Sequence, residues 1–282
     1  MQVVNTPEEV REALKNTFEG KTVGLVPTMG FLHEGHLSLV RKSKEENHIT
    51  VVSIFVNPIQ FGPREDLADY PRDMDRDLLL LEQEGVDLVY APQPQDMYED
   101  DFSTYVEETR LSTGLCGAAR PGHFRGVCTV VLKLFNIIAP DRAYFGLKDY
   151  QQFQVIRRMA RDLNVPVEVI GCPIVREPDG LALSSRNMYL SPAERESALL
   201  LNRSLEKARE MARAGEKSCQ KIKSRVLETL ASDPAVSVEY VCLKNSGNLE
   251  DLEWLDREAV LALAVRVGKA RLIDNTLLQP AE

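Results

Sequence analysis

Hydrophobic and polar positions follow two alternating patterns along the first two-thirds of the chain. Short apolar runs rich in β-branched residues predict buried strands, and the clearest is Ile49 to Val56, which Asn57-Pro58 terminates. Longer segments with apolar residues on one face predict helices between these runs. The predicted strands are 23–26, 49–56, 87–90, 142–145 and 165–170. Three predicted helices span 72–84, 127–138 and 150–163. Another begins at Pro7, and one more follows Gly30 and ends near Glu46. Such alternation predicts an α/β fold with a parallel sheet.

The last third of the chain has a different pattern. Ser191-Pro192-Ala193-Glu194 is a capping box that opens a helix, and a second helix is predicted over 217–230. Three strand-like runs follow at 237–243, 259–267 and 269–274. This order predicts a smaller α+β domain. We place the boundary between residues 175 and 176, where Pro173, Pro178 and Gly180 cluster.

Composition excludes several classes of protein. The formal charge of −9 over 282 residues argues against a nucleic-acid binder, which carries a basic footprint. The apolar runs are too short for a membrane span, and the first ten residues do not resemble a signal peptide. Five widely spaced cysteines indicate neither a disulfide framework nor a zinc site. We therefore expect a cytoplasmic protein that acts on small molecules.

The most informative stretch is PTMGFLHEGH, Pro27 to His36, which follows a predicted strand and opens a helix. At such a junction free backbone N–H groups and the helix dipole favour phosphate. Gly30 and Gly35 have the spacing of a P-loop, but His36-Leu37 replaces its Lys-Ser/Thr pair. His33 and His36 can share a face and offset charge on a phosphoryl group. The alternative is a helix start with two exposed histidines.

Two further constellations favour a polyphosphate ligand. Gly146-Leu147-Lys148-Asp149 follows a predicted strand, so that Lys148 can reach phosphates and Asp149 a ribose. Leu183-Ser184-Ser185-Arg186 offers two hydroxyls and a guanidinium just after the domain boundary. The alternatives are a polar helix cap for the first and an ordinary loop for the second.

Amide side chains follow the predicted strands and suit a small polar substrate. Asn57 and Gln60 follow the strand 49–56, and Gln152 begins the helix after Lys148. A turn built on Asn57-Pro58 is the alternative for Asn57. The glycine-rich segment 114–126 carries Arg120 and His123, and is either a mobile anion-binding lid or a plain connection.

Most of these residues lie in four motifs that together resemble the pantoate–β-alanine ligase (pantothenate synthetase) family. The motifs are VPTMGFLHEGH at 26–36, SIFVNPIQFGPREDLADYPR at 53–72, FGLKDYQQ at 145–152 and VREPDGLALSSRNMYL at 175–190. The resemblance implies a Rossmann-like domain of the class I nucleotidyltransferase/synthetase type over 1–175 and a small C-terminal α+β lid domain over 176–282. It also implies a homodimer.

The resemblance implies an ATP-dependent condensation of (R)-pantoate with β-alanine, through a pantoyl adenylate, that releases AMP and pyrophosphate with Mg²⁺. It places His36 in the position of a proton donor, and from their charge and hydrogen-bond donors we predict that His33, His36, Lys148 and Arg186 are the catalytic residues. It assigns pantoate binding to Gln60 and Gln152, with Asn57 beside them, and a metal-proximal role to Asp77. The implied ATP-binding residues are Pro27, Thr28, Met29, Gly30, Phe31, Leu32, His33, Glu34, Gly35, His36, Gly146, Leu147, Lys148, Asp149, Val175, Leu183, Ser184, Ser185 and Arg186.

This sequence departs from the family pattern at two places. Leu183 stands where we expect Met, and Arg76 is the neighbour of Asp77 where a second acid would complete a metal site. Two other functions remain as alternatives, a nucleotidyltransferase and a non-catalytic nucleotide sensor. The ligase interpretation predicts that His33, His36, Lys148 and Arg186 meet in one crevice, where they offset the repulsion between a carboxylate and a triphosphate.

Overall fold

The computed structural model describes residues 1–17, 20–63 and 65–281, and its contacts divide the chain into two compact units. The first unit comprises Met1–Leu147 and Gln152–Pro173. The second comprises Lys148–Gln151 and Ile174–Glu282. The short segment Lys148–Gln151 therefore groups with the second unit although it follows a strand of the first. The sequence-based boundary between 175 and 176 stays a prediction.

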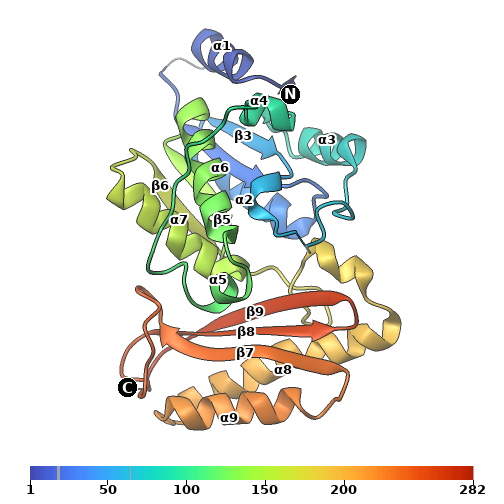
Figure 1. The fold of residues 1–282 in the computed structure, drawn as a ribbon, viewed down its shortest axis with the longest axis vertical. Helices are drawn as coiled ribbons and strands as arrows, with labels where there is room; N and C mark the ends of the chain where they lie inside the picture. The colour runs from blue at the N-terminus through green and yellow to red at the C-terminus, as the bar shows by residue number, and fades with distance from the viewer. Residues whose placement is uncertain (18–19, 64, 282) are drawn as a thin grey trace. The chain divides into compact units, whose positions relative to one another are not determined.

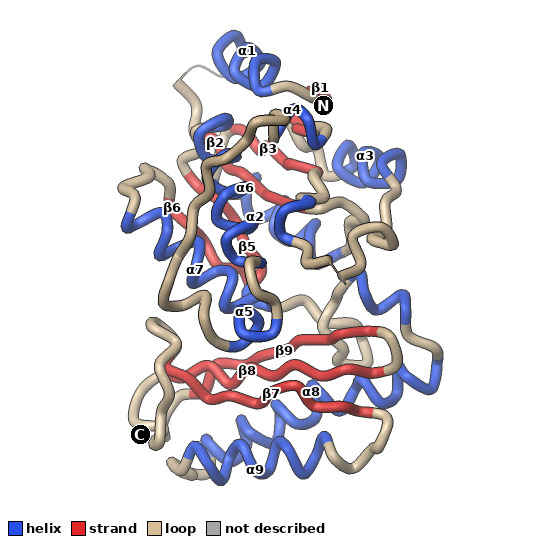
Figure 2. Tube along the Cα trace, viewed as in Figure 1, coloured by secondary structure: helices blue, strands red, loops and turns tan. Residues whose placement is uncertain are grey.

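A parallel six-stranded sheet forms the centre of the first unit (Figure 2). Its strands are β1 (Gln2–Val4), β2 (Val23–Thr28), β3 (Ile49–Ile54), β4 (Leu88–Tyr90), β5 (Arg142–Gly146) and β6 (Glu168–Cys172). Their spatial order is β1-β4-β3-β2-β5-β6. All six residues of β3 are buried, Thr50 and Ser53 included, which explains why apolar and polar residues do not alternate regularly along it.

Helices connect these strands and pack on the sheet. They are α1 (Pro7–Thr17), α2 (Glu34–Glu46), α3 (Met74–Gln83), α4 (Pro94–Met97), α5 (Leu115–Ala119), α6 (His123–Ile138) and α7 (Tyr150–Asp162). Leu37, Leu39 and Val40 of α2 and Leu81 of α3 share a buried cluster with side chains of the sheet. Helix α6 buries most of its length.

The strand order reverses at β2, which is where an open parallel sheet binds its ligand. The chain runs outward from β2 to β3 on one side, whereas β5 pairs with β2 on the other side. Ligands of such sheets bind outside the carboxyl ends of the strands at this switch point. The residues that follow β2 begin at Met29, and those that follow β5 begin at Leu147. Two of the predicted phosphate-binding segments therefore start at the switch point.

The second unit packs two helices on a three-stranded antiparallel sheet (Figure 1). The helices are α8 (Pro192–Arg213) and α9 (Cys219–Leu230), and the strands are β7 (Val236–Asn245), β8 (Ala259–Val267) and β9 (Ala270–Leu278). Leucines and alanines at helical spacing on α8, including Leu201 and Leu205, form one buried cluster with the inner face of the sheet. This unit confirms the predicted α+β arrangement.

The predicted elements are confirmed and their boundaries move by a few residues. The capping box at Ser191 is present, because Ser191 Oγ accepts from Glu194 N and Glu194 Oε2 accepts from Ser191 N. The prediction missed the short elements β1, α4 and α5, whose three to five residues are too few to show a period. It also missed three 3₁₀ turns, Pro58–Gln60, Leu147–Asp149 and Ser185–Tyr189.

Candidate functional site

The loop between β2 and α2 is held in place by one carboxylate. Asp77, in the first turn of α3, is 1% exposed and accepts from the backbone N–H of Phe31 at 2.6 Å and of Leu32 at 2.7 Å. Burial raises the pKa of Asp77, while the bonds from Leu32 and Phe31 oppose that shift. The contacts give Asp77 a structural role in fixing this loop, and its metal-proximal role stays a prediction.

The same loop has an unusual backbone that requires glycine at one position. Gly30 has φ +77°, and a Cβ there would lie 3.0 Å from Asp77 Oδ2 and 3.1 Å from Ile54 Cγ2. Phe31 also has a positive φ of 50°. Arg76 supports Phe31, because its guanidinium lies 5.4 Å from the ring centroid and donates to the Leu32 carbonyl at 2.9 Å. Arg76, which looked like a departure from the family pattern, thus reinforces the loop.

The two predicted histidines lie against each other at the start of α2. Their ring centroids are 4.0 Å apart and the planes are tilted by 33°. His33 is the N-cap residue, and its backbone N–H donates to His36 Nδ1 at 3.3 Å. A neutral imidazole that accepts at Nδ1 carries its proton on Nε2. His36 is therefore set to donate from Nε2 at a helix N-terminus, which is a site suited to anions.

The side chain of Gln60 is held in position by its buried neighbour Asn57. Asn57 is 1% exposed and its Nδ2 donates to Gln60 Oε1 at 3.0 Å and to the Gly126 carbonyl at 3.2 Å. Gln60 Nε2 donates to the thioether of Met29 at 3.1 Å. Because a thioether is a weak acceptor, Gln60 Nε2 keeps most of its capacity to bind a polar substrate. The first and second motifs therefore meet at Met29 and Gln60.

Two residues that the sequence analysis did not identify complete this arrangement. Tyr98 donates its hydroxyl proton to Asn57 Oδ1 at 2.8 Å, and burial raises the pKa of Tyr98, so that it stays a donor. Gly126 allows α6 to approach the 3₁₀ turn, because a Cβ there would lie 2.5 Å from the Ile59 carbonyl oxygen and 2.6 Å from Gln60 Cα. Both polar atoms of the Asn57 side chain, Nδ2 and Oδ1, are thus hydrogen-bonded within the protein. These contacts give Asn57 a positioning role.

The glycine-rich segment 114–126 is tied to the same turn. Arg120 forms a two-pronged ion pair with Glu65, with Nε–Oε1 at 2.7 Å and Nη2–Oε2 at 2.6 Å. Arg120 Nη1 also lies 3.1 Å from His123 Nε2, and His123 Nδ1 lies 2.9 Å from the Gln60 carbonyl oxygen. Because a guanidinium can only donate, these contacts fit a His123 that accepts at Nε2 and donates from Nδ1. In this structure the segment supports Gln60.

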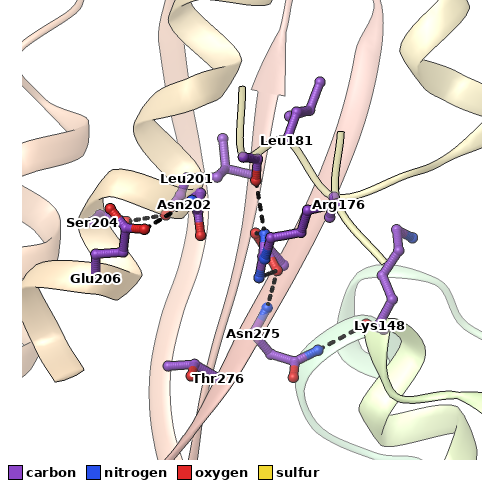
Figure 3. Close-up of polar contacts among 12 residues, drawn as sticks. Lys148, Arg176, Leu181, Leu201, Asn202, Ser204, Glu206, Asn275 and Thr276 are labelled. Atoms are coloured by element: carbon purple, nitrogen blue, oxygen red, sulfur yellow. Dashed lines mark hydrogen bonds and ion pairs between the residues drawn. The ribbon is translucent and has the colours of Figure 1, made fainter. Parts of the chain in front are cut away.

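In the second unit, the turn that carries Lys148 is anchored by β9. The Lys148 carbonyl accepts from Asn275 Nδ2 at 2.9 Å, and the Tyr150 hydroxyl donates to the Ser246 carbonyl at 2.9 Å (Figure 3 shows the first). Lys148 Nζ lies 3.7 Å from Asp149 Oδ2, and the lysine side chain is 20% exposed. The backbone of the turn is therefore fixed. The Lys148 ammonium group, by contrast, is partly exposed and forms only a long ion pair with Asp149.

The fourth motif forms a closed turn in the same unit. The Leu183 N–H donates to the Val175 carbonyl at 3.0 Å, which joins the two residues predicted to complete the nucleotide pocket. Ser184 is the N-cap of the 3₁₀ turn and its hydroxyl accepts from Arg186 N at 3.3 Å. Part of the Ser184 hydroxyl capacity therefore serves the turn itself.

The predicted site residues are distributed over both units. Those of the first unit are Pro27 to His36, Asn57, Gln60, Asp77, Gly146, Leu147 and Gln152, and those of the second are Lys148, Asp149, Val175 and Leu183 to Arg186. Within the first unit, contacts join the first motif to Gln60 and to Asp77. Within the second, β9 supports the Lys148 turn. That all four segments line one crevice stays a prediction.

The described residues offer neither a metal-ligating cluster nor a membrane-spanning helix. Among residues 1–17, 20–63 and 65–281, no group of three or more His, Cys, Asp or Glu side chains is placed to hold a metal ion. In the same part of the chain, no helix combines the length and the apolar character needed to cross a membrane.

Comparisons with known proteins bear on the identity of the whole chain. A family model described as pantoate–β-alanine ligase matches residues 2–277. Pantothenate synthetase of Pseudothermotoga lettingae is 58% identical over 278 residues, which cover 99% of both chains. The enzyme of the same name from Thermotoga petrophila is 57% identical over 279 residues, covering 99% of this chain and all of the other.

Solved structures agree over the whole length. A crystal structure of pantothenate synthetase from Thermus thermophilus superposes with a TM-score of 0.95 at 47% identity, covering 99% of this chain and 100% of that one. A pantoate–β-alanine ligase from Francisella tularensis, complexed with β,γ-ATP and β-alanine, has a TM-score of 0.81 at 33% identity and covers 98% of this chain and 97% of its own. From the motifs, the sheet and these matches, the chain belongs to the pantoate–β-alanine ligase family.

Proposed function

We propose that this chain joins pantoate to β-alanine in two steps at the expense of ATP. In the first step a carboxylate oxygen of pantoate attacks the α-phosphorus of ATP, and pyrophosphate leaves with the electron pair of the broken P–O bond. In the second step the amine nitrogen of β-alanine attacks the acyl carbon of the pantoyl adenylate. AMP leaves, the nitrogen loses a proton, and pantothenate is the product.

The observation that carries this proposal is the family match over residues 2–277. The geometry of the first unit supports it, because the histidine-bearing loop starts at the switch point of a parallel sheet. Family membership also favours the ligase over a nucleotidyltransferase or a nucleotide sensor. ATP and β-alanine are bound by the homologous Francisella tularensis enzyme, and we assign both as substrates here.

His36 and Gln60 would act on the reacting groups in the first unit. His36 Nε2 is directed by the bond at Nδ1 and would donate to a phosphate oxygen as charge builds on it. Gln60 Nε2 would donate to a hydroxyl or carboxylate oxygen of pantoate, since its Oε1 is occupied by Asn57. We assign Gln152, half-buried near the start of α7, to the same substrate. Charge stabilisation, rather than proton donation, is the role we propose for His36, because pyrophosphate leaves readily.

Lys148 and Arg186, which belong to the second unit, would offset the negative charge of the triphosphate. A fixed cation near the phosphates lowers the repulsion between two anions that must approach each other. Asp149 would accept from ribose hydroxyls, and Val175 and Leu183 would contact the adenine. Leu183 in place of Met keeps an apolar side chain of similar volume at this position.

Mg²⁺ would take most of its oxygen ligands from the phosphates of ATP, as it does in many nucleotide sites. This fits the described residues, which offer no ready-made cluster of metal ligands and whose Asp77 oxygens accept backbone N–H groups. When bound, the ion would screen the triphosphate charge. A homodimer and a cytoplasmic location also form part of the proposal, and all five cysteines are free thiols, as a reducing compartment would keep them.

Product analysis tests the proposal. The protein is incubated with ATP, Mg²⁺, (R)-pantoate and β-alanine, and AMP and pantothenate are quantified together. We expect equal amounts of the two, with neither formed when one organic substrate is omitted. AMP release that does not require both substrates would contradict the ligase assignment.

The adenylate intermediate needs its own measurement. Pantoate labelled with oxygen-18 in its carboxylate should transfer one label to AMP, because the attacking oxygen stays on the α-phosphorus. ATP and pantoate alone should also support exchange of labelled pyrophosphate into ATP. Unlabelled AMP from labelled pantoate would rule out an adenylate, while leaving the overall condensation intact.

A further inference from the structure

The Lys148 turn has a partner that the proposed mechanism does not use. Asn275 lies on β9, more than a hundred residues along the chain, and its Nδ2 donates to the Lys148 carbonyl at 2.9 Å. Asn275 is 5% exposed, and its bond to Lys148 is part-buried. Figure 3 shows the Asn275 side chain directed at the backbone of Lys148. This hydrogen bond from the Asn275 amide constrains the position and the orientation of the Lys148 carbonyl. It therefore sets where the Lys148 side chain begins.

Asn275 is itself held by a buried ion pair. Its backbone N–H donates to Asp274 Oδ1 at 2.8 Å. The Asp274 side chain is 2% exposed and receives both Arg176 Nη1 at 2.6 Å and Nη2 at 2.9 Å. Such a two-pronged pair has little freedom to move. The strand that carries Asn275 is therefore fixed at this point by Arg176.

Arg176 connects the same support to the fourth motif. Its Nη1 also donates to the Gly180 carbonyl at 3.2 Å, and its backbone forms a bridge with Ala182. Leu183 to Arg186 follow directly after that bridge. Two adjacent buried residues of β9 therefore support both of the segments that we assign to nucleotide binding in the second unit. Asn275 contacts the Lys148 turn directly, and Asp274 supports the Leu183–Arg186 segment through Arg176.

We propose that Asn275 is a positioning residue for Lys148, and that Asp274 and Asn275 together set the spacing between Lys148 and the Ser184–Arg186 turn. The inference rests on the proposed function, since it takes these segments as the binding site for the ATP phosphates. Asn275 touches no reacting atom in this scheme. Its effect is to hold the lysine at the distance that the triphosphate requires.

Two substitutions at Asn275 test the role of its donor. Asn275→Ala removes the bond and Asn275→Asp replaces the donor with a carboxylate that repels the Lys148 carbonyl. We expect the KM for ATP to rise about tenfold to a hundredfold with Ala, as for other small displacements of a catalytic group, and further with Asp. The KM for pantoate should stay within about twofold, because Gln60 and Gln152 belong to the first unit.

A matched control stands next to Asn275 on the same strand. The Thr276 hydroxyl is bonded to Arg209, away from the Lys148 turn, and Thr276→Val keeps the β-branched shape. This variant should retain the native KM values. Thermal unfolding of all three variants shows whether they fold, and a variant that unfolds early is measured well below its melting temperature.

The outcomes separate this inference from the proposed function. Binding of ATP is measured by equilibrium dialysis as well as by kinetics, so that the inference is tested even if no pantothenate forms. Native ATP affinity in folded Asn275→Ala would overturn the inference. A rise in both KM values by the same factor would also overturn it, since that result indicates a general structural defect. Loss of ATP binding alone supports it.

Discussion

At the scale of single residues, buried polar partners decide which atom of each candidate group faces a ligand. His36 accepts at Nδ1 and Gln60 accepts at Oε1, so each presents a donor, Nε2 in both cases. In the proposed reaction the partners of these side chains are a triphosphate and a carboxylate, which are acceptors. The hydrogen-bond partners within the protein therefore match the chemistry proposed for these two side chains.

Replacing His36 by alanine should lower the rate of adenylate formation by about a hundredfold or more, since a donor directed at developing charge is lost. The measurement is pantoate-dependent release of pyrophosphate. His48→Ala is the matched control, because this exposed histidine pairs with Thr22 before β2, at the other end of the strands. An unchanged rate in His36→Ala would show that the ring does not act on the phosphates.

At the scale of elements, the loops carry the chemistry and the helices hold the loops. The start of α3 supplies Asp77 to the loop before α2. The segment before α6 supplies Arg120, and the first residue of α6 is His123, which contacts the turn after β3. Each loop is thus fixed by an element distant in sequence. This arrangement keeps a flexible backbone in one shape without burying unpaired backbone groups.

Asp77→Asn should loosen the loop that carries His33. The asparagine carbonyl can accept from only one of the two N–H groups, those of Phe31 and Leu32. Its NH₂ group then faces the other N–H, so that one of the bonds at 2.6 and 2.7 Å is lost. We expect a loss of about 1–3 kcal/mol in the free energy of unfolding, as for an unsatisfied buried group. Urea unfolding measures it, and exposed Asp75→Asn on the same helix is the control. Equal effects of the two variants would contradict this role.

The ion pair between Glu65 and Arg120 predicts a dependence on pH. Burial alone would raise the pKa of Glu65, but the hydrogen bond and charge of Arg120 lower it below the ordinary 4.5. The charged form therefore stabilises the fold above that pH, and this contribution is lost as the pH falls through the folded-state pKa. Glu65→Gln should cost about 0.5–1 kcal/mol at neutral pH, a value limited by solvent screening.

Urea unfolding at pH 7 and near pH 4 tests this expectation. The difference between the native protein and Glu65→Gln should shrink at the lower pH, because protonation removes the charge from the native side chain as well. Exposed Glu12→Gln serves as the control and should show a small difference at both values. A Glu65→Gln difference that grows toward acid pH would reverse the sign and contradict the assignment.

At the scale of the whole molecule, the two units contain different parts of the proposed site. Gln60 and Gln152, which we propose to bind pantoate, belong to the first unit, whereas Lys148 and the Leu183–Arg186 turn belong to the second. The turn Lys148–Gln151 is joined covalently to β5 but bonded to β9 and to Ser246. Substitutions in the two units should therefore affect different substrates.

Gln60→Leu and Lys148→Ala measure this division. Gln60→Leu should raise the KM for pantoate by about tenfold or more and leave the KM for ATP near the native value, because it removes one polar contact to a small substrate. Lys148→Ala should raise the KM for ATP and lower kcat, since the role we propose for the lysine is to offset the charge of the triphosphate. Steady-state kinetics with each substrate varied gives both constants. Identical changes in both variants would argue against separate roles.

The sequence predicted most of the architecture because the architecture depends on local patterns. Val23 to Val26 and Ile49 to Val56 are mostly apolar and show no regular alternation with polar residues, a pattern typical of strands buried on both faces of a parallel sheet. Ser191 and Glu194 specify a helix start through neighbouring atoms. The same locality explains why His33 and His36, three residues apart, were found as a pair.

What the tertiary structure decided are the partners that lie far away along the chain. The bonds from Tyr98 to Asn57, from Arg120 to Glu65 and from Asn275 to Lys148 join residues separated by 41, 55 and 127 positions. No local period records such a pairing, because it depends on how whole elements pack. The sequence by itself determined the elements and the chemistry of the motifs. The packing decided which atoms of the motifs are bonded to distant parts of the chain and how the loops that carry them are held in place.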